Sequence, residues 1–140
     1  MKLYGFILMM KGLSLQFFSD KEEVQTQWIE ALKSSCILLD LKEEYDIGAL
    51  LGRGNFAKVH ECYKRNDSDK KKYALKTIEK KTIKNCKRNI QSVLLEIDIM
   101  RALNHPYIIK MYEVYESNKY VHLVLSHLEG GELFDRIKAK

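Results

Sequence analysis

The sequence predicts an α+β fold, with a five-stranded antiparallel sheet and one long helix preceded by a shorter strand–helix segment. Short runs rich in β-branched and aromatic residues alternate with turn residues through most of the chain. Two other stretches, residues 21–35 and 89–103, place apolar residues at helical spacing. The single proline, Pro106, and the pair of glycines at 130–131 mark breaks between the predicted elements.

Residues 1–36 are expected to form a hairpin followed by a helix. Residues 3–18 have the pattern of two short strands with a turn at residues 11–12. Ser19, with Glu22 three residues later, matches a helix N-cap and capping box. Trp28 falls on the apolar stripe of the helix that follows, where it is expected to anchor a core.

Residues 37–44 are expected to be a linker, and residues 45–140 a second domain. Turn residues bound each of its five predicted strands, which cover residues 45–51, 57–63, 72–78, 109–115 and 120–125. The long helix, residues 89–103, lies between the third and fourth strands and ends before Pro106. A further helix is expected to begin at residues 132–140, after the glycine pair.

Composition excludes several classes of protein. The formal net charge is +5, but the lysines lie mostly in residues 70–87, mixed with Asp67, Asp69 and Glu79, which is typical of a solvated surface. No aromatic residues interleave residues 79–88, so no nucleic-acid partner is expected. Cys36, Cys62 and Cys86 are odd in number and lack metal-ligand spacing, which favours reduced thiols in a cytoplasmic protein.

Gly52 and Gly54 stand between the first two strands of the second domain. A glycine pair there lets backbone amides approach phosphate oxygens and lets the turn adopt positive φ, although a simple tight hairpin has the same pattern. The glycines are followed by a strand around Val59, whereas those of a dinucleotide-binding fold open a helix. The pattern therefore favours a phosphate-binding hairpin over a Rossmann fold.

A lysine and a glutamate in the same domain favour phosphate binding further. Lys76 ends an apolar strand near the glycine turn, where it is either a phosphate ligand or an ordinary edge lysine. Glu96 projects from the apolar stripe of its helix, between Val93 and Met100. A carboxylate facing a core needs a partner, and Lys76 is the natural one; the alternative is a solvent-exposed Glu96 at the edge of the stripe.

The segments LGRGNFAKV, YALK, LLEIDIMRALNHPYIIK and LVLSHLEGGELFDRI, in this order, resemble the small lobe of a eukaryotic protein kinase. The resemblance covers residues 45–140, and NHPYII and EGGELFDRI are most similar to serine/threonine kinases of the calcium/calmodulin-dependent group. It implies transfer of the ATP γ-phosphoryl group to hydroxyls of a protein substrate, with ATP and Mg²⁺ as cofactors.

The resemblance also implies roles for individual residues. Lys76 would hold the α- and β-phosphates and Glu96 would hold Lys76, which makes these two the catalytic residues. Leu125 would be the gatekeeper, and residues 126–128 the hinge that pairs with adenine. The implied nucleotide-binding residues are Leu51, Gly52, Arg53, Gly54, Asn55, Phe56, Ala57, Lys58, Val59, Ala74, Lys76, Leu125, Ser126, Leu128 and Glu132.

Some features depart from the family pattern. Ala57 replaces the usual third glycine, and Ser126 replaces an acidic residue common at the start of the hinge. No H-R-D or D-F-G motif occurs, so the catalytic base and the Mg²⁺ ligands would lie in a missing C-terminal lobe. The chain alone is therefore expected to be inactive and to bind ATP poorly. The alternative function is a pseudokinase, a scaffolding module that binds nucleotide or partners without catalysis.

The segment LSLQFFSDKEEVQTQWIEALKSS resembles the last strand and closing helix of a pleckstrin-homology domain, with Trp28 as the buried helix tryptophan. An intact domain of this type would imply a phosphoinositide membrane as a partner and recruitment to the membrane surface. The strands that bind the lipid head group would lie upstream of residue 1.

Overall fold

The computed structural model describes residues 1–10, 12–85, 90–131 and 137–138. The chain divides into two compact units, Met1–Cys36 and Ile37–Lys140. None of the helices in the described ranges has both the length and the apolar character needed to cross a membrane.

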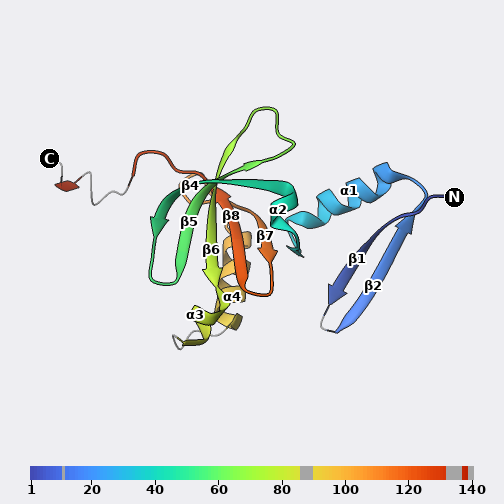
Figure 1. Ribbon diagram of the computed structural model, residues 1–140, viewed down its shortest axis with the longest axis horizontal. Helices are drawn as coiled ribbons and strands as arrows, with labels where there is room; N and C mark the ends of the chain where they lie inside the picture. The colour runs from blue at the N-terminus through green and yellow to red at the C-terminus, as the bar shows by residue number, and fades with distance from the viewer. Residues whose placement is uncertain (11, 86–89, 132–136, 139–140) are drawn as a thin grey trace. The chain divides into compact units, whose positions relative to one another are not determined.

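The first unit is a hairpin followed by a helix (Figure 1). Strands β1 (Tyr4–Met10) and β2 (Leu13–Ser19) pair antiparallel, in the register that places Tyr4 opposite Ser19. Gly12 lies in the turn between them with φ +87°, a left-handed conformation that glycine adopts without strain. Helix α1 (Glu22–Lys33) follows, so the predicted hairpin and helix are both present.

The predicted N-cap of α1 is wrong. Ser19 is still paired within β2, and the N-cap position is Lys21, which has no capping side-chain hydrogen bond. The Ser19 hydroxyl oxygen instead accepts a hydrogen bond of 3.1 Å from the backbone N–H of Lys21. Glu22 and Glu23 in the first turn provide the negative charge that stabilises a helix N-terminus.

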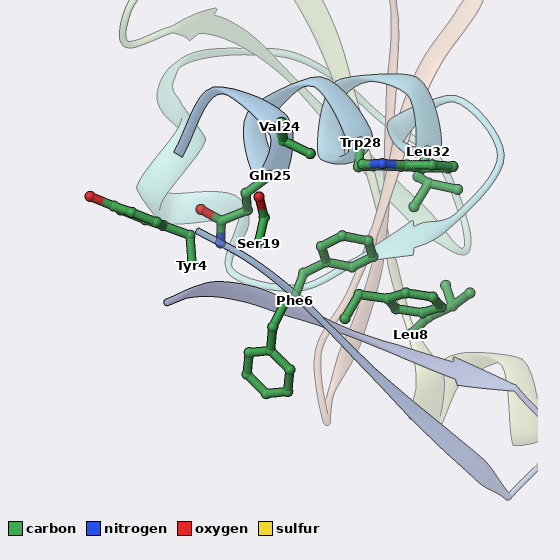
Figure 2. Close-up of a pocket in the computed structure, with 10 residues that line it drawn as sticks. Tyr4, Phe6, Leu8, Ser19, Val24, Gln25, Trp28 and Leu32 are labelled. Atoms are coloured by element: carbon green, nitrogen blue, oxygen red, sulfur yellow. The ribbon is translucent and has the colours of Figure 1, made fainter. Parts of the chain in front are cut away.

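An apolar pocket of about 220 Å³ lies between α1 and the hairpin (Figure 2). Val24, Trp28 and Leu32 project from α1 toward the hairpin strands. The expectation of a buried Trp28 is wrong, because this side chain is 57% exposed. A two-stranded hairpin is too narrow to enclose an indole ring that stands on a single helix.

The second unit contains a six-stranded sheet with the strand order β3-β7-β8-β6-β5-β4 (Figure 1). Its strands are β3 (Ile37–Leu38), β4 (Tyr45–Arg53), β5 (Ala57–Lys64), β6 (Lys72–Glu79), β7 (Met111–Glu116) and β8 (Tyr120–Ser126). All neighbouring strands pair antiparallel except β3, which is parallel to β7. The sheet thus has the five predicted strands and a sixth, β3. Together with the short helix α2 (Leu41–Glu44), β3 occupies the stretch expected to be a linker.

Helix α4 (Ile90–Ala102) covers one face of this sheet (Figure 1). Its Val93 and Ile97 are buried in a cluster of apolar side chains from the sheet, which includes Ile78 and Leu123. A short helix that was not predicted, α3 (Lys80–Asn85), follows β6 directly. The predicted start of the long helix at Asn89 and most of the predicted helix over 132–140 lie outside the described residues.

The opposite face of the sheet carries an aromatic cluster around a buried carboxylate. Glu113 accepts hydrogen bonds of 2.9 Å from the hydroxyls of both Tyr45 and Tyr115, and its other oxygen lies 3.8 Å from Nζ of Lys64. Burial, and then the charge of Glu113, raise the pKa of the Tyr45 hydroxyl. The same causes raise the pKa of the Cys62 thiol to about 12. These groups therefore keep their protons and fill the core of this face.

Candidate functional site

The glycine turn joins β4 to β5. Gly52 pairs with Val59, and the N–H of Gly54 donates a 2.9 Å hydrogen bond to the carbonyl of Ala57. The expectation of positive φ is wrong, since neither Gly52 nor Gly54 has one. What glycine provides is space: a Cβ at Gly52 would meet no atom within 4 Å, and one at Gly54 would meet only the Ala57 carbonyl, at 3.8 Å. The backbone of this turn is therefore open to a ligand.

The ion pair expected from the sequence is present below this turn. Nζ of Lys76 lies 2.9 Å from Oε1 of Glu96 and donates a hydrogen bond to it. Lys76 stands on β6 opposite Val59, and Glu96 reaches it from α4. The two side chains are 31% and 33% exposed, so the ammonium group is fixed in position yet accessible.

The glycine turn and the ion pair line one cavity of about 160 Å³. Its polar wall is Lys76 and Glu96, and Phe56 at the tip of the turn is part of its lining. The remaining lining residues are Gly54, Asn55, Ala57, Ile78, Ile83 and Val93. Groups that are 20 residues or more apart in the sequence thus meet around a space that combines one positive charge with open backbone.

A cluster of apolar side chains adjoins this cavity on the same face of the sheet. Ala74 and Leu125 lie directly opposite each other on β6 and β8, and Val59 packs against the cluster to which both belong. Leu51 on β4 is 46% exposed, so it is a free apolar side chain at the edge of the sheet.

The other predicted site residues lie at the surface or beyond the described part. Arg53, Asn55 and Lys58 are exposed around the turn. At the end of β8, the N–H of Ser126 donates a 2.9 Å hydrogen bond to the carbonyl of Lys110. The Ser126 hydroxyl oxygen accepts a bond of 3.1 Å from the Lys110 N–H. Leu128 is 66% exposed. The last predicted residue, Glu132, lies outside the described residues.

Sequence reasoning missed one polar contact near this site. Glu61 of β5 lies 3.7 Å from both Lys72 and His127, which follows Ser126 in the chain. The only sequence signal was a glutamate two residues after Val59, hence on the same face of the strand. Among the residues that the structure describes, no group of three or more His, Cys, Asp or Glu side chains could hold a metal ion.

The family model described as "Protein kinase domain" matches residues 45–140. The chain is 42% identical over 101 residues to the mouse serine/threonine-protein kinase DCLK3, which covers 72% of this chain and 12% of that protein. It is 43% identical over 102 residues to calcium-dependent protein kinase 20 of Oryza sativa subsp. japonica, covering 72% and 18%. With calcium/calmodulin-dependent protein kinase type 1 of Caenorhabditis elegans it shares 37% identity over 100 residues, covering 71% and 28%. The chain thus spans only a small part of the length of these relatives.

Proposed function

This chain belongs to the protein kinase domain family, and from this premise we propose that residues 45–140 bind ATP for a protein serine/threonine kinase. Such an enzyme transfers the γ-phosphoryl group of ATP to hydroxyls of protein substrates. The relatives named as serine/threonine or calcium-regulated kinases support this class of reaction.

The observation that carries the proposal is the cavity shared by the glycine turn and the Lys76–Glu96 pair. A triphosphate needs a positive charge and backbone N–H groups that it can approach closely. The Lys76 ammonium is one-third exposed, and a Cβ at Gly52 would meet no atom within 4 Å, which supports a close approach of phosphate to the turn. The apolar cluster that includes Ala74 and Leu125, with Val59 packed against it, adjoins them, and an adenine ring would lie there.

Each group has a distinct role in this proposal. The Lys76 ammonium would hold the α- and β-phosphates, and Glu96 would prevent it from folding away by holding it from α4. The turn from Gly52 to Lys58 would cover the phosphates, with Arg53, Asn55, Phe56 and Ala57 along it. The backbone of residues 126–128 would pair with the adenine edge, below the gatekeeper Leu125, and Glu132 would contact the ribose.

Bound Mg²⁺ would neutralise charge on the phosphates and so favour their transfer. The described residues contribute to this chemistry through Lys76 and the backbone N–H groups of the turn. These groups would orient the phosphates for transfer.

A nucleotide titration followed by NMR tests the proposal and detects weak binding. MgATP should shift the amide signals of Gly52, Gly54 and Ser126, and the Lys76→Met variant should lose the shifts of the two glycines. No shift in the wild type, or unchanged shifts in the variant, would contradict the proposed site. A phosphate-transfer assay of the full-length protein, with the same variant as control, then separates a kinase from a pseudokinase: a pseudokinase binds MgATP but transfers no phosphate.

Residues 1–36 carry a separate proposal. We propose that they are the end of a pleckstrin-homology-type domain, because a strand pair is followed by a helix whose Trp28 faces it (Figure 2). In a cytoplasmic protein, a complete domain of this type would bring the kinase to phosphoinositide membranes. Co-sedimentation of the full-length protein with vesicles that contain or lack phosphoinositides tests this, and equal binding to both would contradict it.

A further inference from the structure

Glu61 is a half-buried carboxylate that connects three parts of the second unit. It lies on β5, two residues beyond Val59, and its side chain is 19% exposed. Its Oε2 accepts a 3.1 Å hydrogen bond from the hydroxyl of Tyr63. Its Oε1 lies 3.7 Å from Nζ of Lys72 on β6 and 3.7 Å from Nε2 of His127.

The neighbouring strand leaves room for this arrangement. Gly48 of β4 faces Glu61, and a Cβ there would stand 3.2 Å from the ring of Tyr63 and 3.3 Å from the Cβ of Glu61. Such distances are tight for a side chain, so glycine at this position allows the carboxylate and the phenol to lie against the sheet. The carboxylate is therefore held by its surroundings rather than free in solvent.

The contact with His127 reaches the segment proposed to bind adenine. Strand β8 ends at Ser126, so His127 is the first residue after the strand ladder. Its side chain is only 12% exposed and is directed at Glu61. A side-chain contact at this point restricts the backbone of residues 127–128, which follow the strand pairing that ends at Ser126.

We propose that Glu61 is a positioning residue for the nucleotide, which acts by holding His127 and thereby the hinge backbone. The inference rests on the proposed function. Strand β5 then has two roles in the proposed adenine site. It provides Val59, and through Glu61 it also holds the hinge backbone. Glu61 touches the hinge side chain and is not expected to contact ATP.

Hydrogen exchange of the full chain tests this directly, without ATP. The amide of Ser126 reports on the hinge, and that of Gly54, which donates to Ala57 at 2.9 Å, reports on the glycine turn. Glu61→Gln and His127→Gln should each speed exchange at Ser126 by about threefold to fivefold, as expected for the loss of one partly exposed side-chain contact. The double variant should be no faster than either single one, because both remove the same contact.

A matched control uses Lys72, the lysine that contacts the same carboxylate. Lys72→Gln removes a charge at the same 3.7 Å distance but leaves His127 in place, so exchange at Ser126 should not change. Equal acceleration in this variant, additive effects in the double variant, or the same acceleration at Gly54 would overturn the inference.

Titration with a fluorescent ATP analogue completes the test. Glu61→Gln and His127→Gln should weaken binding by about threefold to fivefold, and Lys72→Gln should leave it unchanged. A wild-type chain that binds no ATP would overturn the proposed function, and with it the role of Glu61 in nucleotide positioning. ATP binding that is equal in all variants would overturn the role of Glu61 alone.

Discussion

Replacing Lys76 with methionine separates the two roles that its ion pair can have, which are to stabilise the fold and to present a charge to phosphate. Methionine keeps an unbranched chain of similar length but removes the ammonium group. The Glu96 carboxylate then loses its 2.9 Å partner. We expect a small effect on stability and a large one on nucleotide binding.

The structure sets both magnitudes. The two side chains are 31% and 33% exposed, so water screens the pair and can solvate Glu96 once Lys76 is gone. Pairs of this kind contribute roughly 0.2–1 kcal/mol, and the free energy of unfolding should change by no more than about 1 kcal/mol. A hydrogen bond to a charged group contributes about 1.5–3 kcal/mol, which corresponds to a roughly 10- to 150-fold higher Kd for ATP.

Lys80→Met is the control for this prediction. Lys80 pairs with Glu116 at 2.6 Å, and these side chains are 25% and 41% exposed, so loss of the ammonium should cost a similar amount of stability. It should not affect the Kd for ATP, because neither Lys80 nor Glu116 lines the cavity that the glycine turn shares with Lys76 and Glu96. Unfolding in urea is best followed by circular dichroism, since the only tryptophan, Trp28, belongs to the first unit and does not report on the second.

Three results would refute the reasoning about Lys76. Equal weakening of ATP binding by both lysine variants would show a general effect of net charge. An unchanged Kd in Lys76→Met would remove Lys76 from the site. A loss of several kcal/mol in unfolding free energy would show that the Lys76–Glu96 pair mainly stabilises the fold.

Three further predictions concern the core. Ile97 is 1% exposed, so Ile97→Ala should lower the free energy of unfolding by about 2–5 kcal/mol. A smaller loss, measured by urea unfolding, would contradict the packing of α4. Tyr45→Phe removes one of two hydroxyl donors from the buried Glu113 carboxylate and should cost about 1.5–3 kcal/mol; no loss would mean that this bond is not formed. His122 contacts the Thr77 hydroxyl at 2.9 Å, and burial lowers the pKa of its imidazole. The unfolded chain therefore binds a proton at this residue more readily than the folded chain does. The free energy of unfolding should fall as the pH drops below about 6.5. Urea midpoints measured from about pH 7.5 to about 5.5 should show this fall in the wild type and a smaller one in His122→Gln, and equal slopes would contradict it.

Periodicity and charge were enough to predict the part of the fold that carries the site. The residues around Val59 and Lys76 have the composition and turn boundaries of two strands, and these strands pair antiparallel in the structure. Glu96 could be paired with Lys76 from sequence because a carboxylate on an apolar stripe requires a cation within reach. Because burying an unpaired charge is costly, a charged residue on an apolar stripe indicates that a partner of opposite charge lies nearby.

The features that sequence could not provide depend on contacts between distant residues. Strand β3 has only two residues and no periodicity, and it exists because β7 offers an edge to pair with. Ser19 has the chemistry of an N-cap, yet pairing with Tyr4 keeps it in a strand. The contact of Glu61 with His127 joins residues that are far apart in the sequence, and neither has a local pattern that indicates the other.

The register of β6 determines which of its residues lie on each face of the sheet. Along this strand Ala74 and Lys76 face α4, whereas Leu75 is fully buried in the aromatic cluster of Tyr45 on the opposite face. A slip of one residue would exchange the faces and place the Lys76 ammonium among tyrosines, without Glu96. The cost of such an unpaired buried charge, added to the loss of packing around Leu75, therefore fixes the strand in one register. The aromatic face thus contributes to the nucleotide site without touching it, because it determines which side of the sheet presents the lysine.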